Sequence, residues 1–203
     1  MKKLFVTLSV IALAIGGAFA QKVTFPTDNK GRICYTKEFE TELTKAELIE
    51  DASTWAVTTF HASDAVFSKD EAKGELLVNG AVKSGSAYNP FAGTYNEYVN
   101  FVIKFNVQDG KVTYTLYRPT LTETYSGYGT NAKTTNMDDM YISYVQAFAN
   151  IKDAKENPSI SKKDQRSIIR DAEKVIHDYE ESLQKASIVI GNVTKDLEKA
   201  LSR

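Results

Sequence analysis

Asp109-Gly110 stands between two runs in which apolar and polar residues alternate. This dipeptide favours a two-residue turn of type I′ that joins antiparallel strands. If Gln108 opposes Lys111, apolar residues face each other in successive pairs: Val107 with Val112, Phe105 with Tyr114, and Ile103 with Leu116. A slip of one residue would move all of these side chains to the other face. The sequence therefore predicts a hairpin over residues 95–119, which ends at Pro119 because proline cannot donate a ladder hydrogen bond.

The segment before this hairpin reads as strand, helix and two short strands. Residues 32–40 alternate as a half-buried strand does. Thr44 and Glu47 form a capping box at the start of a helix that places Trp55 in the core and ends near His61. Strands are then predicted over residues 65–69 and 75–83. Gly80, inside the second of these strands, indicates a bulge or a close approach of another group to the backbone.

Residues 120–136 are predicted to form a loop, and two helices follow within residues 137–203. Asn136 caps the first helix, and the second starts near Ser161. The second helix carries an apolar stripe at a spacing of about 3.7 residues, typical of a straight α-helix. Two interpretations remain open for the distal part of this stripe. Either the helix bends at Gly191 and covers the stripe itself, or the stripe is an interaction surface, formed by Ile190, Val193, Leu197 and Leu201.

In the order of its predicted strands and helices, the chain resembles a known family. Residues 32–119 resemble the bacterial family called domain of unknown function 4468, described as having a TATA-binding-protein-like fold. The resemblance is carried by Ile33 to Lys37, by the helix with Leu48 and Trp55, and by the segments 69–80 and 101–117. It implies an α+β fold, a β-α-β-β-β-β-α domain with an antiparallel sheet, followed here by a helical extension. The family brings no assigned activity, cofactor or catalytic residue, and a fold name implies nothing about DNA.

Residues 1–20 have the three parts of a secretory signal peptide. Lys2 and Lys3 precede an apolar run, and Ala18-Phe19-Ala20 supplies small residues for cleavage before Gln21. The apolar run is too short to span a bilayer. We therefore expect an exported protein, periplasmic or secreted, with residues 21–31 as a linker to the domain and no membrane span after cleavage.

Composition and motifs argue against several classes of function. The chain has 25 Lys and Arg against 26 Asp and Glu, so it lacks the basic field of a nucleic-acid-binding protein. Cys34 is the single cysteine, which excludes an intramolecular disulfide. His61 and His177 stand apart in sequence without a nucleophile or carboxylate constellation. We find no catalytic, cofactor-binding or metal-binding motif, and we expect a protein that is not an enzyme.

Tyrosine and asparagine concentrate in residues 84–100 and 120–131. Tyrosine rings can stack on a ligand while their hydroxyls form hydrogen bonds. The candidate ligand contacts are Tyr88, Phe91, Tyr95, Tyr125 and Tyr128. The alternative is that these segments only pack over the sheet. We therefore expect a non-catalytic envelope protein that binds a protein, peptide or glycan, or else a structural or assembly protein that acts, with a partner or a second copy, through its C-terminal helices.

Overall fold

The computed structural model describes residues 22–89, 93–126 and 132–202. Within them, strands form one antiparallel sheet in the order β1-β5-β4-β3-β2, and β6 pairs with β5 on the same side as β1. The strands are β1 (Cys34–Glu40), β2 (Val66–Asp70), β3 (Glu75–Asn89), β4 (Gly93–Gln108), β5 (Lys111–Ser126) and β6 (Ala132–Asn136). The predicted α+β fold with an antiparallel sheet is confirmed, with one strand more than the sequence predicted.

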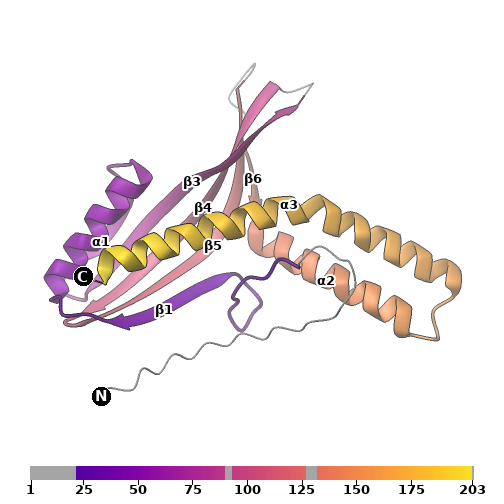
Figure 1. Cartoon of the computed structure of the whole chain (residues 1–203), viewed down its shortest axis with the longest axis horizontal. Coiled ribbons are helices and arrows are strands. Elements are labelled where there is room, and N and C mark those ends of the chain that lie inside the picture. Colours follow the sequence, from indigo (N-terminus) through magenta and orange to yellow (C-terminus); the bar gives the residue numbers. More distant parts are fainter. Residues whose placement is uncertain (1–21, 90–92, 127–131, 203) are drawn as a thin grey trace.

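The helices are α1 (Lys45–Phe60), α2 (Met137–Glu156) and α3 (Lys162–Leu201). Figure 1 shows α1 and the C-terminal half of α3 on the sheet, whereas the N-terminal half of α3 continues past the sheet and runs beside α2. The capping box at Thr44 and Glu47 is present as predicted. Trp55 is buried on the inner side of α1, where its indole N–H donates to the Asp196 carboxylate of α3.

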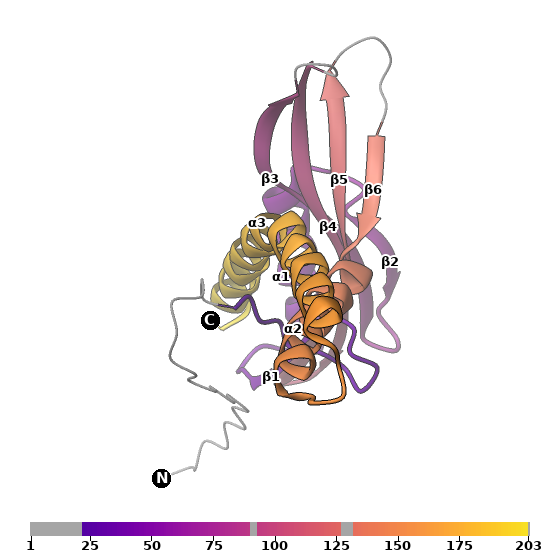
Figure 2. The same cartoon turned by 90° about the vertical axis from the view of Figure 1, so that its right-hand side faces the viewer.

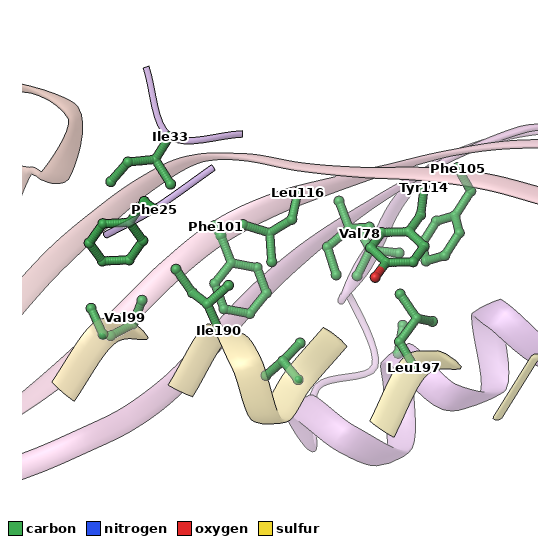
Figure 3. Packing of buried hydrophobic residues seen from close by; sticks show 14 of the residues in the cluster. Phe25, Ile33, Val78, Val99, Phe101, Phe105, Tyr114, Leu116, Ile190 and Leu197 are labelled. Carbon is green, nitrogen blue, oxygen red and sulfur yellow. The ribbon is translucent and has the colours of Figure 1, made fainter. Parts of the chain in front are cut away.

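One hydrophobic core joins the sheet to all three helices. Along β4 the buried residues alternate with partly exposed ones, so only one face of the sheet carries the core. Figure 3 shows Ile190 and Leu197 of α3 directed at sheet residues that include Phe101 and Tyr114. The other face carries exposed or partly exposed and mostly polar residues, such as the exposed Asn79, and we call it the open face.

The apolar stripe of α3 is covered by the protein itself. Ile190, Leu197 and Leu201 are fully buried and Val193 is 6% exposed, all within the same core as the strands. The helix continues through Gly191 without a break. The expectation that a straight helix would leave its distal part uncovered is therefore wrong, because the sheet and α1 cover the distal half while α2 covers the proximal half. Residues 162–201 are thus part of the domain's core and not an appendage to it.

The predicted hairpin register is confirmed, from Gln108 opposite Lys111 to Ile103 opposite Leu116. Its turn differs from the expected type, since only Gly110 has a positive φ, of 73°, and type I′ requires positive φ at both central residues. The physical reason lies outside the hairpin. The Asp109 carboxylate accepts from the Lys45 N–H at 2.8 Å, and the Gly110 N–H donates to the Leu43 carbonyl. The turn is thus docked against the start of α1.

Pro119 does not end the hairpin, contrary to the prediction. Arg118 and Pro119 together oppose the single residue Phe101, which makes a bulge, and pairing with β4 resumes at Thr120. The bulge removes the proline from the ladder, so its missing N–H breaks no hydrogen bond. Residues 120–126 and 132–136, expected in a loop, are therefore strands.

The strands continue beyond this bulge as an arm. A second bulge lies between Lys83 and Gly85 on β3. We call residues 85–89, 93–98, 120–126 and 132–136 the arm. Figure 2 shows that the arm projects past the helices, in the same direction for all of its strands. Bulges bend and twist strands. The two bulges therefore account for the change in strand direction where the arm begins.

The segment expected to be a linker packs on α2. Val23 and Phe25 are each 7% exposed. Their backbone N–H groups donate to the hydroxyls of Tyr144 and Tyr141, both at 3.2 Å. Residues 22–31 therefore belong to the folded domain in so far as the structure describes them.

Candidate functional site

The arm brings two predicted ligand contacts together. Tyr95 on β4 and Tyr125 on β5 are directly opposed across the strands, and their ring centroids lie 5.2 Å apart with a tilt of 38°. Both side chains are half-buried. Ala87 on β3 is the next cross-strand neighbour of Tyr95, so it adds only a methyl group beside the ring. On the β3 side, the row that holds the tyrosine pair therefore ends in a small side chain.

A second cross-strand row lies one step closer to the helices. It contains Gly85, Glu97, Glu123 and Lys133, from β3, β4, β5 and β6. Glu97 and Glu123 are directly opposed, an arrangement that is unfavourable unless cations or hydrogen-bond donors compensate for it. Successive rows on one face are two residues apart, so the two carboxylates and the two tyrosine rings share the face that α3 approaches.

Lys185 of α3 compensates for Glu97. Its ammonium lies 3.2 Å from the Glu97 carboxylate and 2.8 Å from that of Glu181, one turn earlier on the helix. The hydrogen bond to Glu181 is the main cause of a raised Lys185 pKa, and it lowers the pKa of Glu181. Glu97 is only 7% exposed. A side chain at Gly85 would enter this space, because a Cβ there would lie 3.2 Å from the Glu97 carboxylate and 3.7 Å from the Lys185 nitrogen.

The Tyr125 hydroxyl compensates for Glu123 by donating a hydrogen bond to its carboxylate. This bond is the main cause that raises the pKa of Tyr125 to about 12. The pKa of Tyr95 is also raised, first by burial and then by the neighbouring charges of Glu97 and Glu123. Both hydroxyls therefore remain neutral donors at physiological pH. We call Tyr95, Glu97, Glu123, Tyr125, Glu181 and Lys185 the arm site.

The other predicted ligand contacts do not join this site. Tyr88 is opposed to Thr94, so it points to the face opposite Tyr95, and it is 71% exposed. Phe91 and Tyr128 lie outside the described residues. The stripe formed by Ile190, Val193, Leu197 and Leu201 lies in the core, as described above.

Sequence reasoning missed the charged members of the arm site. Glu97 and Glu123 become neighbours only if pairing continues past Pro119, and that depends on a bulge with two residues opposite one. Lys185 and Glu181 are an ordinary i, i+4 pair on the polar side of a long helix. The available signal was the placing of Tyr95 and Val99, which stand at odd-numbered positions like the apolar residues of 101–107.

The remaining chemistry-bearing residues stand apart from the arm site. His61 is the left-handed C-cap of α1, with φ of 51°, and Cys34 lies in β1 opposite Tyr117 on the open face. Among the described residues, no group of three or more His, Cys, Asp or Glu side chains is placed to hold a metal ion. The arrangement of the arm site suits hydrogen bonding and ring stacking.

No family model matches the chain, and no curated protein matches it. Two solved structures are similar to it. A TBP-like protein from Parabacteroides distasonis is 18% identical, with a TM-score of 0.48 over 87% of this chain and 96% of that one. A DUF4468 family protein from Bacteroides ovatus is 15% identical, with a TM-score of 0.40 over 82% of this chain and 90% of that one.

The chain resembles both. Their names agree with the resemblance that residues 32–119 carry to the DUF4468 family and its TATA-binding-protein-like fold. Neither name states an activity, a ligand or a partner.

Proposed function

We propose that this protein is an exported, non-catalytic binding protein that takes a glycan at the arm site. The observation that carries the proposal is the half-buried Tyr95–Tyr125 pair beside the Glu97 and Glu123 carboxylates. A tyrosine ring offers a flat apolar surface to the C–H face of a pyranose, and its hydroxyl offers a hydrogen bond. Carboxylates accept hydrogen bonds from sugar hydroxyls.

The charges of this region favour a neutral ligand over a cationic peptide. Glu97 is bound by Lys185, and Glu123 lies between the Tyr125 hydroxyl and its cross-strand neighbour Lys133. Glu181 also pairs with Lys185, so three carboxylates stand against two lysines, and only one net negative charge (2 − 3 = −1) remains for selecting a cation. The carboxylate oxygens still have lone pairs beyond those engaged by one donor each, and these remain for the hydroxyls of a sugar.

The site is also held by paired elements. Each tyrosine stands on a strand with a paired neighbour, and Lys185 stands in the middle of the long helix α3. Groups fixed on strands and helices lose less conformational entropy on binding than groups on loops. This rigid placement supports binding. Because Lys185 engages the Glu97 carboxylate and the Tyr125 hydroxyl engages the Glu123 carboxylate, we propose no reaction.

The alternative, assembly through the C-terminal helices, has less support. The apolar residues that suggested it are buried against the protein's own sheet. No helix in the described part of the chain combines the length and apolarity needed to cross a bilayer.

Export is tested by intact-mass measurement of the protein recovered from its source cells. The proposal predicts a chain that begins at Gln21 and is found outside the cytoplasm. A mature species that keeps residues 1–20 would contradict it.

Ligand binding is tested with an array of neutral and acidic oligosaccharides and a panel of lysine-rich peptides. We expect binding to a neutral oligosaccharide by the chain from Gln21 to Arg203. The double variant Tyr95→Ala/Tyr125→Ala should lose it, while Tyr88→Ala should bind as the parent does, because Tyr88 points to the opposite face. Binding only to peptides, or equal loss in the Tyr88 variant, would contradict the proposal.

A further inference from the structure

A cleft of about 430 Å³ lies on the open face, beside the bulge at Arg118 and Pro119. Backbone and small side chains of β3, β4 and the α1–β2 connection form part of its wall. Its polar lining residues are Asp64, Asn79, Asn100, Arg118 and Thr120. Small-molecule sites occupy roughly 300–1,000 Å³, so this cleft fits a ligand of the size of an amino acid or dipeptide.

Arg118 occupies a backbone conformation that disfavours it. Its φ is 53°, in the left-handed region where glycine would be free of strain. The bulge that takes Pro119 out of the ladder holds Arg118 in this conformation, and residues strained in this way cluster at functional sites. The guanidinium lies 5.7 Å from the centroid of the Tyr117 ring, and within the described residues it forms no ion pair. Its five N–H donors therefore remain for a ligand.

Asp64 lines the same cleft and is exposed. Over the described ranges it pairs with no cation, Arg118 included. The Arg118 guanidinium and the Asp64 carboxylate thus line one cleft without forming an ion pair with each other. Such a pair of separated opposite charges is complementary to a molecule that carries a carboxylate at one end and an ammonium at the other.

Amide and hydroxyl groups line the same cleft. The Asn100 amide nitrogen donates to the hydroxyls of Thr120 and Thr122, at 3.4 and 2.9 Å, which fixes the plane of the amide. Its oxygen then remains as an acceptor in the cleft wall. Asn79 contributes a second side-chain amide. Such groups suit the N–H and C=O of a peptide bond.

We propose that this cleft binds a small zwitterion, an amino acid or a dipeptide with both termini free. The carboxylate binds the Arg118 guanidinium, whose planar fork matches its two oxygens. The ammonium faces Asp64. The cleft lies on the face opposite the arm site, so the two proposals name different residues and different ligands.

The test is calorimetric titration of the chain from Gln21 to Arg203 with the common L-amino acids and with dialanine. We expect saturable binding of at least one of them. Blocking either end of the bound ligand, by N-acetylation or C-amidation, should weaken it by about tenfold or more, because each end loses a charge-assisted hydrogen bond. Absence of binding by every probe, or equal binding of the blocked forms, overturns the proposal.

Variants place the ligand in the cleft. Arg118→Gln and Asp64→Asn should each weaken binding by about tenfold or more. Arg170→Gln is the matched control, since Arg170 is exposed on α3 and pairs with Asp171, and it should bind as the parent does. Arg118→Gly should abolish binding without lowering the melting temperature, because glycine relieves the left-handed strain. A lowered melting temperature in that variant, or unchanged binding in Arg118→Gln, would show that Arg118 serves the fold instead.

Discussion

The indole N–H of Trp55 on α1 donates to the carboxylate of Asp196 on α3, at 3.0 Å and across 141 positions of the chain. Trp55 is 6% exposed, so its single donor needs a partner inside the protein. The bond fixes α1 against the C-terminal half of α3. Both helices are thereby held in one layer on the sheet.

Asp196→Ala should lower the free energy of unfolding by about 1–3 kcal/mol, because it leaves the buried indole N–H unpaired. Urea denaturation measures this. Lys195→Ala is the neighbouring control on an exposed position of the same helix, and it should change the stability little. Equal stability of the Asp196 variant and the parent would mean that water replaces the carboxylate.

Gly80→Ala should destabilise the protein, whereas Gly191→Ala should stabilise it. A Cβ at Gly80 would lie 2.1 Å from a ring carbon of Phe101, but a Cβ at Gly191 would meet nothing within 4 Å. Overpacking costs about 1–3 kcal/mol, and alanine for glycine inside a helix gains about 1 kcal/mol. Melting temperatures of the two variants should therefore shift in opposite directions. Shifts in the same direction would refute the close approach of Phe101 to β3.

Leu197→Ala should lower the free energy of unfolding by about 2–5 kcal/mol, as expected for a fully buried leucine. Light scattering should give the same mass for the variant and the parent, because the side chain lies in the protein's own core. Ile188→Ala, at a position that is 60% exposed, should change stability little. A fall in mass with stability retained would instead assign the stripe to a partner.

The sequence predicted the central hairpin because its apolar pairs leave only one workable register. It predicted the capping box and the close backbone approach at Gly80 from local chemistry, and the structure confirms both. The arm was not predicted, because a proline normally ends a strand. Here the bulge at Arg118 and Pro119 removes the proline from the ladder, and the strand continues. The turn type was not predicted either, since Asp109 serves the N–H of Lys45 in another element.

The sequence predicted the tyrosines of the arm site but not its charged residues. Tyr95 and Tyr125 stood out by composition, and the structure pairs them. Their charged neighbours follow from the register beyond the bulge and from the path of α3. The sequence also could not predict that the apolar stripe of α3 is buried. Its burial depends on tertiary contacts, because α2 packs on one half of the helix and the sheet packs on the other.

Tyr125 should ionise at about pH 12, against an ordinary pKa of 10.0. Because the hydrogen bond to Glu123 raises the folded-state pKa above the unfolded one, its stabilising contribution is complete below about pH 10. It is lost as the pH rises from about 10 to 12. Ultraviolet titration of the parent against Tyr125→Phe isolates this ionisation. In Glu123→Gln the transition should move back toward pH 10, and a titration identical to the parent's would argue against the Tyr125–Glu123 bond.

The most direct test of glycan binding at the arm site is an amide NMR titration with the neutral oligosaccharide that binds best on the array. The account predicts chemical-shift changes confined to residues 94–98, 121–126 and 181–188, where the strands carry Tyr95 and Tyr125 and α3 carries Lys185. Amides of Asn79 and Arg118, on the open face, should not move. Changes centred on the open face, or no bound oligosaccharide at all, would contradict it.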